Sequence, residues 1–95
     1  MSALAVEKLR SAFPALQGSG DRKPYIYFDG PGGTQMAKQA IEGMLAYITG
    51  GMANLHGAFP TSMGTDNLLL EGRKAVADLL HCAPEELAFG QNMTT

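Results

Sequence analysis

The chain lacks the features that mark several large classes of protein. Its 95 residues include one cysteine, Cys82, so no disulfide forms within the chain and we expect a reducing, cytoplasmic location. Seven basic and nine acidic residues form no basic stripe, which argues against a nucleic-acid partner. No apolar run is long enough for a signal peptide or a membrane span. With 45% hydrophobic residues, the composition is that of a globular protein.

Several familiar site motifs are also missing. The glycine-rich turn from Asp29 to Thr34 does not end in the Gly-Lys-Ser/Thr of a phosphate-binding P-loop. The spacing Gly-x-Gly-x-x-Gly of dinucleotide-binding proteins does not fit it either. No second histidine or cysteine lies at ligand spacing from His56, which argues against a metal site.

Helical and β-rich stretches alternate along the chain, which predicts an α/β protein with helices over a sheet. Two short strands do not complete a sheet, so the fold is expected to be incomplete. Helices are predicted over Leu4–Phe13, from an N-cap at Thr34 through Ile48 with a stop at Gly50-Gly51, and from Thr65 or Asp66 to about His81. Strands are predicted at Pro24–Phe28 and Leu87–Phe89, and a long loop over Gly51–Gly64.

The two longer helices carry apolar residues at helical spacing. The predicted stripe of the second helix is Met36, Ala40, Met44 and Ile48, and that of the third is Leu69, Gly72, Val76 and Leu79 or Leu80.

Two loop segments are candidates for chemistry. The turn Asp29–Thr34 is either a tight strand-to-helix turn capped by the Asp29 side chain or a place where backbone closely approaches a ligand. The segment Asn54–Gly57 places His56 beside a glycine in an irregular stretch. His56 is either a proton carrier, stacking partner or hydrogen-bond donor, or a surface histidine without a role.

A third cluster lies at the end of the last predicted helix, where Asp78 neighbours His81 and Cys82 at i+3 and i+4. A nucleophile and base pair is one interpretation. The favoured one is structural: Cys82 follows a Leu79-Leu80 pair that we expect to be buried, and His81 suits the helix dipole.

The last residues, Asn92-Met93-Thr94-Thr95, follow the predicted strand Leu87–Phe89 and Gly90. A strand that ends in this way usually leads into a helix, whose free N–H groups and threonine hydroxyls bind anions. The chain therefore resembles the opening segment of a larger phosphocofactor-binding protein, cut at its phosphate-binding turn. A plain turn at the end of a strand is the alternative.

Three blocks, in their order and spacing, resemble the N-terminal quarter of class V aminotransferases. The blocks are Tyr25–Thr34, Asn54–Gly57, and Glu86–Phe89 with Met93-Thr94. This group contains cysteine desulfurases, selenocysteine lyases and kynureninase, which are pyridoxal-phosphate enzymes of the aspartate-aminotransferase fold (fold type I) and usually homodimers. The resemblance covers about residues 25–95. It implies that residues 25–95 begin the cofactor-binding domain and that residues 1–24 form an N-terminal helix and connector.

The resemblance also implies roles for individual residues. Thr94, with the N–H of Met93 and next to Thr95, would hold the phosphate of pyridoxal 5'-phosphate. Pro31, Gly32, Gly33 and His56 would lie at the substrate entrance. The glycines stand where the family has alanine and Ser/Thr, and Gly57 replaces the family's arginine after the histidine.

The family's Schiff-base lysine, its aspartate on the pyridine nitrogen and its ring-stacking histidine would all lie beyond Thr95. Cys82 does not correspond to the family's catalytic cysteine. The resemblance thus implies part of a cysteine desulfurase-like lyase or transferase that acts on a small amino acid and is inactive alone. Its partners would be a second copy or the remainder of the polypeptide. Two alternatives stay open: a non-catalytic protein-interaction module with exposed methionines, and a small phosphate-binding protein that uses only Thr94-Thr95.

Overall fold

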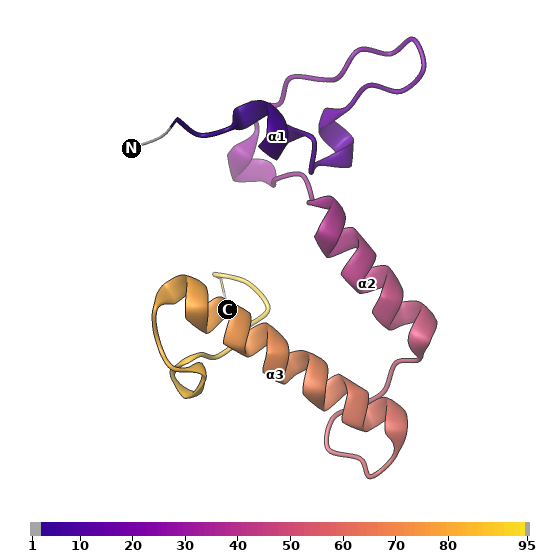
Figure 1. The fold of residues 1–95 in the computed structure, drawn as a ribbon, viewed down its shortest axis with the longest axis vertical. Coiled ribbons are helices and arrows are strands. Elements are labelled where there is room, and N and C mark those ends of the chain that lie inside the picture. Colours follow the sequence, from indigo (N-terminus) through magenta and orange to yellow (C-terminus); the bar gives the residue numbers. More distant parts are fainter. Residues whose placement is uncertain (1–2, 95) are drawn as a thin grey trace. The chain divides into compact units, whose positions relative to one another are not determined.

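A computed structural model of the chain describes residues 3–94 (Figure 1). The chain divides into two compact units, one that ends at Gly50 and one that begins at Gly51.

The first unit contains two α-helices and two short 3₁₀ turns. These are α1 (Val6–Arg10), η1 (Pro14–Leu16), η2 (Gly30–Gly32) and α2 (Lys38–Gly50). Helix α1 is shorter than the predicted helix Leu4–Phe13. Pro14, which cannot continue an α-helix, opens η1 instead. The Gln17 amide then donates to the carbonyls of Arg10 (2.7 Å) and Phe13 (3.1 Å), which closes this segment on itself.

Helix α2 begins three residues later than an N-cap at Thr34 predicts, so Thr34 is not its N-cap. The Lys38 N–H donates to the Ala12 carbonyl (2.7 Å), so a backbone group from the segment after α1 satisfies one of the free N–H groups of the first turn. The predicted stop is confirmed, because α2 ends at Gly50 and Gly51 has a φ of 102°, which favours glycine.

The second unit contains α3 (Pro60–Leu80) and η3 (Pro84–Glu86), and η3 lies against α3. Pro60 occupies the first turn of α3, where its missing N–H has no helical partner to lose. The helix therefore begins five residues before the predicted start, and the irregular loop is shorter than predicted. At the other end His81 adopts a left-handed conformation (φ 57°), and the Cys82 N–H donates to the Ala77 carbonyl (3.0 Å). This is a Schellman motif.

The predicted α/β fold is wrong: the described residues are largely helical and contain no sheet. Their only β-pairing is an isolated bridge between Ser19 and Arg22. Leu87 has extended backbone angles, yet neither it nor Tyr25–Phe28 belongs to a strand. Each unit has a single β-rich segment. Because β propensity measures fit to a neighbouring strand, such a segment cannot form a sheet by itself.

Few side chains are buried in the described residues. Ala77, Ser62 and Thr65 are buried, whereas Leu79 (82% exposed) and Leu80 (63%) are not, so the predicted burial of that pair is wrong. The accessible surface is 8332 Å² for 10.0 kDa. A folded monomer of that mass exposes about 5,200 Å², and two separate globules of half the mass about 6,300 Å² together. Even counted as two independent units, the chain leaves most of its large apolar side chains in contact with solvent.

None of the helices in residues 3–94 combines the length and apolar character needed to cross a bilayer.

Candidate functional site

The glycine turn is shaped by two glycines and one carboxylate. Asp29 precedes η2 but makes no side-chain capping hydrogen bond, so the predicted Asx cap is wrong; the Gly32 N–H donates to the backbone carbonyl of Asp29 instead (3.0 Å). A Cβ on Gly32 would lie 2.7 Å from an Asp29 carboxylate oxygen. Gly33 has a φ of 135°, which disfavours any residue with a side chain. Both positions of this turn therefore favour glycine for local reasons.

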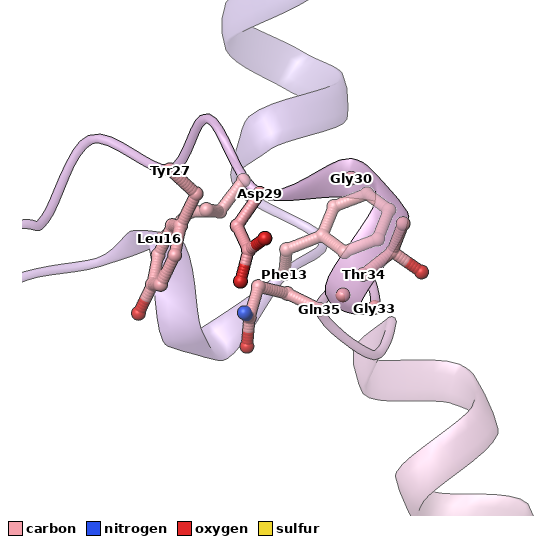
Figure 2. Close-up of a pocket in the computed structure, with 9 residues that line it drawn as sticks. Phe13, Leu16, Tyr27, Asp29, Gly30, Gly33, Thr34 and Gln35 are labelled. Carbon is pink, nitrogen blue, oxygen red and sulfur yellow. The ribbon is translucent and has the colours of Figure 1, made fainter.

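The same turn forms one wall of an open hollow of about 500 Å³ (Figure 2). Phe13 and Leu16, from the segment after α1, contribute apolar side chains to its lining, and the Asp29 carboxylate lies among the lining side chains. Of the predicted entrance residues, Gly32 and Gly33 line this hollow and Pro31 does not. Asp29, Gly30 and Thr34 of the same candidate turn also line the hollow. Its other lining residues were not predicted as site residues: Phe13, Leu16, Tyr27 and Gln35.

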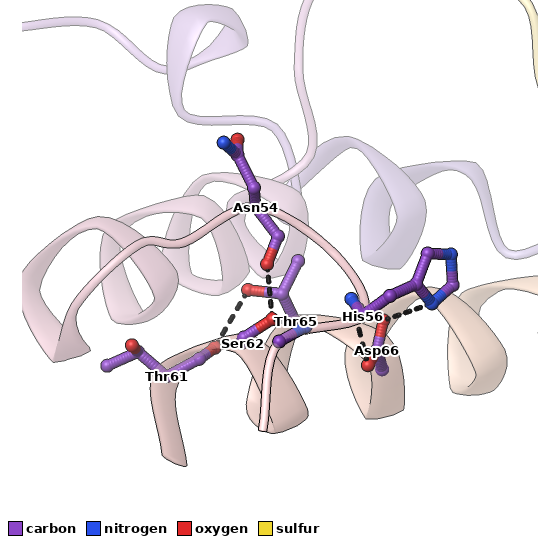
Figure 3. A network of polar contacts seen from close by, with 7 residues as sticks. Asn54, His56, Thr61, Ser62, Thr65 and Asp66 are labelled. Atoms are coloured by element: carbon purple, nitrogen blue, oxygen red, sulfur yellow. Dashed lines mark hydrogen bonds and ion pairs between the residues drawn. The ribbon is translucent and has the colours of Figure 1, made fainter. Parts of the chain in front are cut away.

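In the second unit His56 lies in a loop that α3 holds by two side chains (Figure 3). The Asp66 carboxylate accepts the His56 N–H (3.1 Å) and lies 3.5 Å from the imidazole Nδ1. The Ser62 hydroxyl accepts the Gly57 N–H (2.7 Å) and donates to the Asn54 carbonyl. His56 has a positive φ (67°), and its side chain is 85% exposed. The imidazole is therefore presented outward from a loop whose backbone is hydrogen-bonded to the helix.

The glycine at position 57 is also explained by a local contact. The ring of Phe59, the residue immediately before α3, occupies the space that a Cβ on Gly57 would take. Any larger residue at position 57 requires the Phe59 ring to move.

His56 and Asp66 also border an open hollow of about 580 Å³ over an apolar floor. Charged side chains of both signs surround this floor, which is formed by α3 and by residues near η3. The lining residues are Leu55, His56, Asp66, Leu69, Leu70, Arg73, Pro84 and Glu85.

In the predicted cluster at the end of α3, the backbone groups of His81 and Cys82 form the end of the helix. His81 is the left-handed residue of the Schellman motif, and Cys82 donates its N–H to Ala77. The Asp78, His81 and Cys82 side chains line a shallow hollow, but they make no hydrogen bond with one another in the described part of the chain. This arrangement gives Cys82 no partnered base.

The predicted phosphate turn is exposed. The Thr94 N–H donates to the Asn92 side-chain oxygen (2.9 Å), which closes a small Asx turn. The Met93 N–H and the Thr94 hydroxyl have no partner among the described residues, and Met93 is fully exposed. Thr95, the third predicted cofactor residue, lies outside the described residues.

Searches for related proteins gave no match to a family model, a curated protein or a solved structure. Within residues 3–94, no group of three or more His, Cys, Asp or Glu residues is placed to hold a metal ion.

Proposed function

We propose that this chain contributes the phosphate contact and part of the substrate entrance to a pyridoxal-phosphate-dependent, cysteine desulfurase-like enzyme that acts on an amino acid. The order and spacing of the blocks Tyr25–Thr34, Asn54–Gly57 and Glu86–Phe89 with Met93-Thr94 support the proposal. Because the described residues form no sheet, the proposal rests on these motif residues and on the donors they present, and not on the fold.

The observation that carries the proposal is the donor set at the carboxyl-terminal turn. The Met93 N–H and the Thr94 hydroxyl are both without a protein partner among the described residues and both are open to solvent. Phosphate oxygens accept hydrogen bonds from such groups, so these two donors fit the phosphate of the cofactor. The Thr94 N–H, which already donates to Asn92, is not needed for this contact.

The chain's other proposed contribution is to substrate approach. Gly32 and Gly33 line one open hollow, and the exposed His56 imidazole borders another. An imidazole in water can donate a hydrogen bond to a substrate carboxylate or move a proton. When bound, the cofactor supplies the electron sink for carbanion chemistry at the amino acid.

The chain is proposed to be inactive by itself. None of its four lysines aligns with the lysine to which the family attaches the cofactor. Lys38 pairs with Glu42 (3.7 Å) and Lys74 with Glu71 (3.2 Å), both on exposed helix faces. Under the proposal, other parts of the enzyme supply the lysine, the aspartate on the pyridine nitrogen and the ring-stacking histidine.

The test is a titration of the ¹⁵N-labelled chain with inorganic phosphate and, separately, with pyridoxal phosphate. We expect saturable shifts of the Met93 and Thr94 amide signals with both. The variant Thr94→Val should lose most of this response, whereas Thr34→Val, at another exposed threonine, should keep it. Unmoved Met93 and Thr94 signals, or equal responses in both variants, contradict the proposal. Fixation of pyridoxal phosphate by borohydride to one specific lysine contradicts the expected inactivity.

A second candidate is a non-catalytic protein-interaction module. The observation that favours it is the exposure of Met36, Met44, Met52 and Met63, each 47–61% accessible. Methionine side chains adapt to different apolar partners. Such a module is expected to be a stable monomer with slowly exchanging amides throughout α2 and α3. Size-exclusion chromatography with hydrogen exchange distinguishes it from the first candidate.

A further inference from the structure

The Ser62 side chain is fully buried, although serine is usually a surface residue. Its hydroxyl makes two hydrogen bonds, and both go to the backbone of the His56 loop: Gly57 N–H donates to it, and it donates to the Asn54 carbonyl (Figure 3). These two backbone groups flank His56 in the chain. One buried side chain thus satisfies both ends of a short turn.

A second side chain holds the middle of the same turn. Asp66 lies four residues after Ser62, so both side chains lie on the same face of α3. Asp66 accepts the His56 N–H through both carboxylate oxygens (3.1 and 3.3 Å). Two side chains one helical turn apart therefore hold the loop at three backbone groups, those of Asn54, His56 and Gly57.

This attachment stabilises an unfavourable backbone conformation. His56 has a φ of 67°, in the left-handed region that residues with a side chain enter at a cost. Among the described residues the imidazole has only the Asp66 carboxylate as a partner, at 3.5 Å and with the histidine side chain 85% exposed. An exposed pair of this kind contributes little, so the backbone hydrogen bonds fix the loop.

We infer that Ser62 is a positioning residue: its buried hydroxyl, with Asp66 one turn away, holds the Asn54–Gly57 loop on α3 so that the His56 imidazole is presented outward. The inference that Ser62 and Asp66 position the loop depends only on these hydrogen bonds. Only the use of His56 at a substrate entrance rests on the proposed function.

The direction in which Ser62→Ala changes the amide exchange rates distinguishes a positioning role from that of an ordinary helical serine. Alanine has a higher helix propensity than serine, so a merely helical Ser62 predicts unchanged or slower exchange after the substitution. If Ser62 positions the loop, its removal leaves the Gly57 N–H and the Asn54 carbonyl without partners. We then expect the His56 and Gly57 amides to exchange roughly tenfold faster or more, while amides in the middle of α3 stay unchanged.

The experiment is amide hydrogen exchange by NMR on the full chain and four variants. Ser62→Ala and Asp66→Ala should both speed exchange at His56, and both should weaken the nuclear Overhauser contact between the His56 ring and residue 66 or its neighbours. Asp66→Asn keeps an acceptor and should restore most of the protection. Met63→Ala, at an exposed position in the same turn, is the matched control and should leave the loop unchanged.

Circular dichroism of each variant confirms that α3 still forms. Equal exchange at Gly57 in Ser62→Ala and in the unaltered chain overturns the inference, as does an unprotected Gly57 amide in the unaltered chain. A uniform loss of protection along α3 also overturns it. None of these results involves phosphate, so they are distinct from a failure of the phosphate titration.

Discussion

Glycines at positions 32 and 33 belong to the same turn but are required for different reasons. At Gly32 the Asp29 carboxylate occupies the space of a side chain, whereas at Gly33 the backbone angle itself disfavours one. A carboxylate on a flexible stem can move aside, but a φ of 135° cannot be kept cheaply by alanine. The two positions should therefore respond unequally to substitution.

We expect Gly33→Ala to destabilise the Asp29–Thr34 turn by about 1–3 kcal/mol. Gly30→Ala is the control, because nothing lies within 4 Å of the Cβ it would add and its φ is not positive. Urea titration followed through the amide signals of Gly32 and Thr34 measures both. Equal midpoints for the two variants would show that the turn does not need the glycine conformation.

Position 57 gives a third case. Because the Phe59 ring fills the space beside Gly57, Gly57→Arg should displace that ring and weaken the Gly57 N–H bond to Ser62. We expect a loss of about 1–3 kcal/mol, measured by the thermal unfolding of α3, with most of it recovered in Gly57→Arg combined with Phe59→Ala. No recovery in the double variant would mean that the ring is not the obstacle.

At the scale of single residues, the sequence indicated which positions are unusual, but not the contacts that make them so. The positions of Gly32, Gly57 and His56 were evident from the sequence. The Asp29 carboxylate against Gly32, the ring against Gly57 and the buried Ser62 depend on which side chains meet in space. A serine in the first turn of a helix looks like an ordinary polar residue, so nothing in the sequence marked Ser62 as buried.

At the scale of elements, helix ends were predicted better than helix starts. Gly50-Gly51 ends α2 as expected, because glycine supplies the positive φ of a helix end. The starts were wrong in both longer helices. The Lys38 N–H finds a partner in the Ala12 carbonyl, in place of the predicted cap at Thr34. Pro60 fits the first turn of α3, so that helix begins before the predicted start at Thr65 or Asp66.

The end of α3 offers a clean test of this account. His81 occupies the left-handed position of the Schellman motif, where glycine has no steric cost. His81→Gly should stabilise α3 by about 0.5–1 kcal/mol, whereas His81→Ala should not, because alanine keeps the Cβ. Thermal unfolding followed by circular dichroism at 222 nm compares the two. A more stable alanine variant would mean that the left-handed cap does not form.

For the whole molecule, the exposed area sets the expected behaviour. The chain exposes 8332 Å², well above the area of one or two compact globules of its mass, and Ala77 is its one buried hydrophobic residue in the described range. So small a core contributes little to the free energy of unfolding. The isolated chain should bind a dye such as ANS and self-associate with rising concentration. A monodisperse monomer without dye binding would show that these apolar side chains are covered.

The fold class was the largest error, and it arose at this scale. Tyr25–Phe28 and Leu87–Phe89 have the composition of strands, but composition says only that a residue fits beside a neighbouring strand. Each unit holds one such segment, so neither has a partner within its unit. The resemblance to an α/β family carried the same expectation and could not correct it.

The most direct test of this account is hydrogen exchange at the amides of Tyr25–Phe28, Ala88 and Phe89 in the unaltered chain. These backbone groups make no hydrogen bond among the described residues, so we expect them to exchange nearly as fast as in an unfolded peptide, with protection confined to α2 and α3. Slow exchange at alternate amides of both segments would mean that they are paired in a sheet, and would contradict the helical architecture described above.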